Sequence, residues 1–340
     1  MGDAEHGYYA TRNPLGRGGD FITAPEISQV FGELIGAWCV AVWRALGAPD
    51  PIRLVELGPG HGTLLADLWR GTAAVAPEFI AAVRLHLVEI SAPLRACQQD
   101  ALSTLVPQGA VVWHESLSEV PDGPLLLVAN EFFDALPIRQ FVAEGGVWRE
   151  RRVGLSADGK ELAFVTGSEG DLGEDFAPFE GEIVERCPAG EALAAEIAGR
   201  IAHCGGCALI IDYGHTRSAT GETLQAASGH RRADPLMRPG EADLSHHVDF
   251  TRLRIAAQEA GAVVSGPIAQ GLFLGRLGIA ERGEALAGAA ATPAVGEAVR
   301  GAVRRLVHPG RMGVLFKAMA IAHPASPDVP GFAAAMQAGR

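Results

Sequence analysis

The chain has 340 residues, of which 48% are hydrophobic, and a formal net charge of −12. This length fits one large domain or two, and the hydrophobic content is enough for a substantial core. The negative charge argues against a non-specific nucleic-acid binder and against electrostatic docking on anionic lipid, because both partners attract basic surfaces.

The N-terminus predicts neither a signal peptide nor a membrane anchor. Residues 1–7 are polar and acidic, without the apolar segment of a secretory signal. No uninterrupted apolar run reaches the ~18 residues of a membrane span, since the nearest, 31–46, carries two charges. Five scattered cysteines are typical of a reduced compartment. These features predict a cytoplasmic protein that does not insert into a membrane.

The first helix is expected at about 24–46, after a glycine-rich loop. Thr23 with Glu26 three residues later forms the pattern of a capping box, and Pro25 is tolerated in a first helical turn. The apolar residues of this helix share one face, which should pack on a sheet. The loop before it could fold over a ligand or could be a plain surface loop.

The stretch Glu56 to Thr63 is the strongest functional signal. An apolar strand at 52–57 is followed by glycines at every second position (58, 60 and 62) and then by a helical pattern. Glycine lets the backbone approach a ligand closely. A dinucleotide fingerprint needs a third glycine where Thr63 stands, which disfavours a nicotinamide dehydrogenase. The carboxylate of Glu56 suits a ligand with a cationic amino group; the alternative is a simple tight connection.

Strands and helices then alternate, which predicts a mostly parallel α/β sheet with right-handed crossovers. The second strand ends at Glu89, where an acidic side chain of a nucleoside-binding fold hydrogen-bonds ribose hydroxyls. Further strands are expected at 84–90, 110–115, 125–129 and 207–212, with helices at 91–102 and 189–203.

The periodicity changes after residue 138. Residues 139–187 are predicted to form an inserted β-rich lobe, because a hairpin pattern and acidic, glycine-rich sequence replace the α/β alternation. Residues 188–322 return to the first pattern but include a polar stretch, 214–248, that is interpreted as a long loop. The remaining elements are a helix at 249–260, a strand at 262–268, helices over 270–306, a strand at 312–321 and a flexible tail at 323–340.

Several blocks together resemble the MidA-like family of S-adenosylmethionine (SAM) methyltransferases. GDFITAPEISQ and NEFFDALP are specific to that family, whereas ELGPGHGT indicates only a methyltransferase. IDYG, the 223–239 stretch, HVDF and MGVLFK follow in family order, so the match covers about residues 7–322. The resemblance implies a class I methyltransferase fold, Rossmann-like with a mostly parallel seven-stranded sheet, to which a β-rich lobe and extra helices are added.

The resemblance also implies SAM as the cofactor and arginine in a partner protein as the substrate. The mitochondrial members of the family dimethylate an arginine of a respiratory complex I subunit, so such a subunit is one candidate partner. A homodimer is left open, and no nucleic-acid partner is expected. The residues expected to bind SAM are Glu56, Gly58, Pro59, Gly60, Gly62 and Thr63 for the methionine end, Glu89 for the ribose, Glu115 and Ser116 for the adenine, Asn130 near the methyl group, and Gly19, Asp20 and Thr23 from the preceding loop.

The acceptor side is expected where the fourth and fifth strands end. Glu131 and Asp134 are the predicted catalytic residues, because carboxylates can accept guanidinium N–H groups in pairs and assist proton loss. Their alternative role is that of acids at a helix N-terminus. The residues expected to line the substrate channel are Phe132, Phe133, Asp212, Tyr213 and His247.

Two motifs invite a metal interpretation that we do not adopt. Cys204 and Cys207 form a C-x-x-C pair, but no second pair exists, so two incidental thiols are favoured. His246 and His247 are adjacent in a polar stretch without metal-ligand spacing, and His247 or Asp249 is expected to cap the next helix instead. The functional alternatives that remain are a SAM-binding assembly factor without turnover and a small-molecule methyltransferase.

Overall fold

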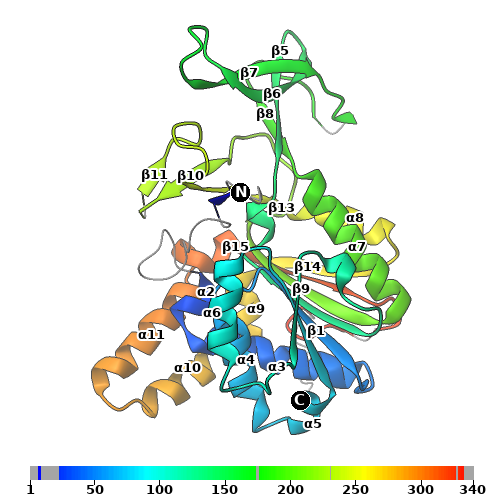
Figure 1. Ribbon diagram of the computed structural model, residues 1–340, viewed down its shortest axis with the longest axis vertical. Coiled ribbons are helices and arrows are strands. Elements are labelled where there is room, and N and C mark those ends of the chain that lie inside the picture. The colour runs from blue at the N-terminus through cyan, green and yellow to red at the C-terminus, as the bar shows by residue number, and fades with distance from the viewer. Residues whose placement is uncertain (1–6, 9–22, 174–175, 230, 327, 333–340) are drawn as a thin grey trace, which may run out of the picture.

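The computed structural model describes residues 7–8, 23–173, 176–229, 231–326 and 328–332, and its centre is a mostly parallel sheet (Figure 1). Seven strands form a continuous path in the order β14-β15-β9-β4-β1-β2-β3, and β13 pairs with β9 beside that path. The predicted α/β architecture with seven strands is confirmed. The strands are β1 Ile52–Leu57, β2 Val83–Val88, β3 Val111–His114, β4 Leu125–Asn130, β9 Gly206–His215, β13 Val248–Asp249, β14 Val263–Ala269 and β15 Phe316–Ala322.

Strands β1, β4 and β9 lie at the middle of the sheet and are almost entirely buried apolar runs. Such runs are expected of parallel strands that are covered on both faces. β1 pairs in parallel with both β2 and β4, and β4 pairs in parallel with β9, whereas β15 is antiparallel to β9 and β14. The carboxyl ends of β1, β2, β4 and β9 therefore meet at one edge of the sheet.

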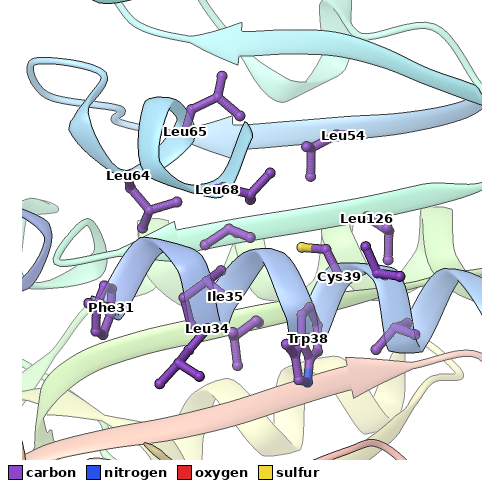
Figure 2. Close-up of a cluster of buried hydrophobic side chains, with 14 of the residues drawn as sticks. Phe31, Leu34, Ile35, Trp38, Cys39, Leu54, Leu64, Leu65, Leu68 and Leu126 are labelled. Carbon is purple, nitrogen blue, oxygen red and sulfur yellow. The ribbon is translucent and has the colours of Figure 1, made fainter. Parts of the chain in front are cut away.

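Helices cover both faces of the sheet. One buried cluster packs α3 and α4 against the strands, and Figure 2 shows Ile35, Trp38 and Cys39 beside Leu54 and Leu126. Gly32 and Gly36 let α3 approach α4 closely, since a Cβ at either would lie within 3 Å of an α4 side chain. The helices on this face are α2 Ala24–Ile27, α3 Gln29–Ala45, α4 Thr63–Ala73, α5 Pro77–Ala82, α9 Gln270–Arg276, α10 Ile279–Gly288 and α11 Pro293–Val307; α7 Pro188–Cys204 and α8 Phe250–Glu259 cover the other face, and α6 Ala92–Leu102 connects β2 to β3.

The expected single helix at 24–46 is two helices. The backbone of Ser28 is extended and its hydroxyl caps α3 by accepting from the Val30 N–H, so α2 ends at Ile27. The predicted capping box is wrong, because Thr23 makes no side-chain cap. The carboxylate of Glu26 instead accepts a hydrogen bond from the Thr63 hydroxyl at 2.9 Å, which ties α2 to α4.

A four-stranded antiparallel lobe stands apart from the main sheet, at the top of Figure 1. Its strands are β5 Arg139–Glu144, β6 Val147–Leu155, β7 Leu162–Glu169 and β8 Ile183–Arg186, in the order β7-β6-β5-β8. Its small core contains Phe141, Ala143, Trp148 and Val184.

The interpretation of 214–248 as a loop without strands is wrong. This stretch contains a three-stranded antiparallel sheet, with β10 Gln225–Ser228 between β11 Arg231–Ala233 and β12 Asp243–Ser245. These strands have three or four residues each, too few to give a clear alternating pattern.

The expected flexible tail also differs from the structure. Val329 is buried in the first core cluster, and the Trp38 indole donates to the Pro330 carbonyl at 3.1 Å. The ring of Phe332 packs on Phe273 with centroids 5.1 Å apart. Residues 328–332 are therefore part of the packed domain.

The predicted final strand begins later than expected. Residues Pro309–Gly313 form a π-helical turn, and only then does β15 begin at Phe316.

Cys204 and Cys207 are free thiols in the last turn of α7 and at the buried start of β9. None of the described helices has the length and hydropathy that a membrane span requires.

Candidate functional site

The glycine turn, residues 58–62, joins β1 to α4 at the carboxyl edge of the sheet. Gly58, Gly60 and Gly62 all have left-handed backbone conformations, with φ of 59°, 57° and 79°. A Cβ at Gly58 would lie 2.7 Å from the Phe132 ring, so both conformation and space require glycine there. Pro59 is buried between these glycines. The turn thus exposes backbone at the N-terminus of α4, where a ligand can approach closely.

Two buried polar atoms beside the glycine turn lack a partner within the described chain. Oε2 of Glu56 and Oδ1 of Asn130 make no hydrogen bond there, although both are buried. Burial without a compensating cation raises the pKa of Glu56 to about 8. A ligand with N–H donors, such as an ammonium group, would satisfy both acceptors. The amino group of SAM fits this requirement.

Glu89 follows β2 and is held in place by its neighbours. Its carboxylate accepts from the Ser91 N–H at 2.8 Å and from the Gln98 amide at 3.2 Å. Burial raises the pKa of Glu89, and these hydrogen bonds oppose that shift. Glu89, the residue predicted to bind the ribose, therefore lies at the same sheet edge as the glycine turn, and each of its two carboxylate oxygens accepts one hydrogen bond from a neighbour.

Gln98 is a site residue that the sequence reasoning missed. It is fully buried on α6, and its amide also donates to the Gly60 carbonyl at 2.9 Å. Its oxygen accepts from the Trp113 indole at 2.8 Å. A single side chain thus connects Glu89, the glycine turn and β3. The available signal was a polar residue among the inward-facing positions of the predicted helix 91–102.

The predicted adenine residues lie just beyond β3. Glu115 is exposed, and its N–H donates to the carboxylate of Glu119, while the Ser116 hydroxyl lies 2.8 Å from that of Ser118. The Glu89 N–H donates to the His114 carbonyl, so this end of β3 adjoins the Glu89 site. Ile90 is 53% exposed there and offers an apolar surface. The roles of Glu115 and Ser116 remain predictions.

The expected contacts from the preceding loop are only partly visible. Gly19 and Asp20 lie outside the described residues. The backbone of Thr23 begins α2, and the next N–H, of Ala24, donates to Glu131 at 2.8 Å. The hydroxyl of Thr63 is engaged by Glu26. Both threonines therefore have structural contacts near the site.

Three carboxyl groups, Glu131, Asp134 and Asp212, gather where β4 and β9 end; we call them the acidic cluster. Glu131 has a left-handed backbone, with φ of 51°, which is uncommon for a residue other than glycine. Besides the Ala24 N–H, it accepts from the Asn130 amide at 3.2 Å. Burial raises the pKa of Glu131 to about 7, and the nearby Asp134 adds to this shift.

Asp212 organises the turn that carries the other two carboxyl groups. It is fully buried, and its Oδ2 accepts from the N–H groups of Phe133 and Asp134 at 3.0 and 3.1 Å. Its Oδ1 accepts from the Tyr213 N–H. The expectation that Asp212 lines the substrate channel is therefore wrong, because the carboxylate is directed to backbone donors. Burial raises the pKa of Asp212 well above its usual range, and Asp134 and Glu131 add to this shift.

Asp134 is also buried, and its side chain hydrogen-bonds that of Tyr213. Burial raises the pKa of Asp134. The alternative of acids at a helix N-terminus does not fit, since the NEFFD segment forms only a three-residue 3-10 turn, Phe133–Ala135. Within the described chain, no Lys or Arg forms an ion pair with any member of the acidic cluster.

Aromatic rings border the acidic cluster on two sides. Phe132 packs against Gly58, whereas Phe133 is 1% exposed and belongs to the second core cluster, so it is not a wall of an open channel. The Tyr213 ring contacts His247 with centroids 5.6 Å apart and Phe316 at 5.4 Å. Phe316 was not predicted as a site residue; it lies in the MGVLFK block, which was used only as a family signal.

A separate small pocket, partly open to solvent, lies between the base of the lobe and β13. Its lining includes Glu185, His215, His246, His247 and Asp249. Asp249 caps α8 as expected, by accepting from the Thr251 and Arg252 N–H groups. No group of three or more His, Cys, Asp or Glu side chains suited to a metal ion occurs among the residues with described positions.

Comparison with known proteins agrees with this geometry. The family model for S-adenosyl-L-methionine-dependent methyltransferases matches residues 34–268. The chain is 39% identical over 342 residues to the mitochondrial protein arginine methyltransferase NDUFAF7 homolog of Drosophila melanogaster, covering 93% of this chain and 77% of the relative. It is 36% identical to human mitochondrial NDUFAF7, also a protein arginine methyltransferase, with coverage of 93% and 76%.

A solved structure is similar over nearly the whole chain. A Burkholderia thailandensis protein solved with bound S-adenosyl-homocysteine (SAH) superposes with a TM-score of 0.82 at 27% identity, covering 98% of this chain and 88% of that one. The predicted fold, cofactor and enzyme class are thereby confirmed. The predicted cytoplasmic location is wrong, because it conflicts with the mitochondrial location in the names of these curated relatives.

Proposed function

The chain belongs to the family of SAM-dependent methyltransferases, and from that premise we propose that it methylates a guanidinium nitrogen of an arginine in a partner protein. The observation that carries the proposal is the acidic cluster beside the glycine turn. Its three carboxyl groups all have raised pKa values, and none of them forms an ion pair with a described Lys or Arg, although Arg305 acts electrostatically to lower the pKa of Glu131. A guanidinium group would supply the missing positive charge. The family resemblance suggests a respiratory complex I subunit as the partner.

SAM supplies an electrophilic methyl group on a sulfonium. In this proposal, Glu56 and Asn130 accept hydrogen bonds from its methionine end, and Glu89 accepts them from its ribose. The fit rests on the unpartnered Oε2 of Glu56 and Oδ1 of Asn130 and on the open backbone of the glycine turn. Because methyl transfer is an in-line displacement, holding both reactants in register provides much of the rate enhancement.

Glu131 is the proposed catalytic contact to the acceptor. Its carboxylate is fixed by the Ala24 N–H and the Asn130 amide, so it can present a remaining lone pair to a guanidinium N–H. With a pKa of about 7, it can also take the proton that the guanidinium must lose on methylation. Asp134 and Tyr213 complete the polar wall, and the ring face of Phe132 favours a cation.

The proposal is tested by incubating the protein with tritiated SAM and an extract of its source organism, followed by acid hydrolysis of labelled protein. Label in methylated arginine is the expected result. Label only in small molecules would instead favour the small-molecule methyltransferase. SAM binding by calorimetry without any transfer would favour the assembly factor. The Glu131→Gln variant should bind SAM but transfer label at least about 100-fold more slowly, and Glu161→Gln, on the exposed surface of the lobe, is the matched control.

A further inference from the structure

The distal half of the β6–β7 hairpin projects beyond the rest of its lobe. β5 pairs with β6 only as far as Arg151, while β6 and β7 remain paired out to Leu155 and Leu162. Residues 152–155 and 162–165 therefore form a two-stranded ribbon. The core residues of the lobe belong to the strands before this point, apart from side chains of the loop that follows β7. An isolated two-stranded ribbon is marginally stable in water, so this one gains little from its own chain.

One face of the ribbon is apolar and open to solvent; we call it the ribbon face. Val153 lies opposite Phe164 and Leu155 opposite Leu162, so all four side chains share that face. Val153, Leu155 and Leu162 are 54%, 63% and 37% exposed. β7, the edge strand of the lobe, carries no charged residue and no proline over 162–168, although such residues normally protect an edge strand from pairing with another chain.

The ribbon face connects to the acidic cluster through a chain of contacts. The Arg151 guanidinium lies 3.6 Å from the centroid of the Phe164 ring and donates to Glu222 at 2.6 Å. The hydroxyl of the next residue, Thr223, accepts from the His247 N–H at 2.9 Å, and the His247 ring packs on Tyr213. A segment on the ribbon face would therefore lie on the side of the lobe that leads to the proposed acceptor site.

Charge selects the kind of partner. Residues 139–187 contain eleven acidic and six basic residues, and the whole chain carries −12. A second copy or an anionic membrane would be repelled, whereas a basic segment would be attracted.

We propose that the ribbon face docks an extended segment of the acceptor protein, apolar on one side and rich in arginine on the other, by strand addition along β7. This inference rests on the proposed function and names where its protein substrate is held. Main-chain hydrogen bonds to the free edge provide affinity, and alternate side chains cover the ribbon face. The net negative charge of the lobe as a whole attracts the arginine side chains.

The test uses the full chain and a defined probe, a capped nine-residue peptide of alternating valine and arginine. We expect fluorescence anisotropy to show salt-sensitive binding, and hydrogen exchange to show protection at 152–155 and 162–168. The triple variant Val153→Thr, Leu155→Thr, Leu162→Thr keeps strand-forming residues but removes the apolar face. It should bind at least about tenfold more weakly. Val165→Thr, on the opposite face, is the matched control and should bind as wild type does.

Equal binding by the triple variant, no binding by wild type, or protection only outside the ribbon would overturn the proposal. So would binding of a valine–aspartate peptide with the same affinity, or a wild-type dimer that the triple variant abolishes. Unchanged SAH affinity in every variant shows that the main domain is intact. A peptide that binds the ribbon but accepts no methyl group in the tritium assay would count against the proposed function and leave the docking surface standing.

Discussion

The glycine turn and the acidic cluster lie at the same sheet edge, yet they are assembled over very different lengths of chain. Around the glycine turn, Gln98 reaches Glu89 over 9 residues and Gly60 over 38. In the acidic cluster, Asp212 holds Phe133 over 79 residues, and Glu131 holds Ala24 over 107. One half of the site is thus built from consecutive elements, from β1 to α6, and the other exists only once distant strands have paired. The first should tolerate changes in the second, and the predictions below test that separation.

The largest expected effect is at the glycine turn. Gly58→Val adds a side chain where the Phe132 ring lies 2.7 Å away and at a φ of 59°. We expect calorimetry to show SAH binding weakened by at least about 100-fold, because the turn must move. Gly109→Val is the matched control, since Gly109 also has a positive φ but has no atom within 4 Å of its added Cβ. An SAH affinity within about threefold of wild type would show that this turn does not hold the cofactor.

Glu131→Gln should separate the two halves. We expect kcat for protein methylation to fall by roughly 10²- to 10³-fold, because a positioned base and hydrogen-bond acceptor is lost. SAH affinity should stay within about twofold, since Glu131 belongs to the other half. Loss of SAH binding together with activity would show that the acidic cluster and the glycine turn are not independent.

The pH dependence of the reaction should report the same carboxyl group. The pKa of Glu131 is about 7, so it is largely protonated at pH 6 and ionised at pH 8. Because the ionised form accepts the guanidinium proton, kcat/KM should rise with pH up to about 7 and then level off. The rise should be absent in Glu131→Gln, measured from its residual rate. A wild-type profile that falls over this range would contradict the role of Glu131.

Glu56→Gln should stabilise the ligand-free protein at high pH. The pKa of Glu56 is about 8 in the folded state and about 4.5 in the unfolded state, so the unfolded protein loses this proton at a lower pH. Its contribution to stability therefore falls as pH rises from about 4.5 to about 8. We expect urea denaturation to show the variant roughly 1–3 kcal/mol more stable than wild type at pH 9 and nearly equal at pH 4.5. The control Glu161→Gln should show no such difference. If Glu56→Gln also binds SAM more weakly, then the stability lost by burying the Glu56 carboxylate serves cofactor binding.

The smallest effect is expected for Gln98→Met, which keeps the volume of the side chain but removes its hydrogen bonds to Glu89 and Gly60. SAH affinity should fall by about tenfold, as expected when one buried polar link is lost. Gln29→Met, in which an exposed amide is removed from α3, is the control. An unchanged affinity would mean that Glu89 needs no support from α6.

These differences also explain what could be predicted from the sequence. The glycine turn, Glu56 and Glu89 were identified because strand, turn and helix signals lie within one short segment. Gln98 was missed because the role of a polar residue on a helix can be recognised only when its neighbours, here in the glycine turn and β3, are known.

The acidic cluster was predicted by residue but not by role. Glu131 and Asp134 were chosen from chemistry, but the burial of Asp212 and its three backbone donors depend on how β4 and β9 pair. The strands at 225–245 were missed for a related reason, since each is too short for a pattern and is stabilised by its partners. Long-range pairing is the information that local patterns lack.

The position of β15 has a consequence for biosynthesis. Although it is the last described strand along the chain, it lies inside the sheet between β14 and β9, and Phe316 at its start packs on Tyr213. A nascent chain that has emerged only to residue 315 exposes an open edge of β9 and lacks the support of Tyr213. Such a chain can complete its glycine turn but cannot yet form a finished acceptor site. Translation itself therefore delays the second half of the site until β15 has left the ribosome.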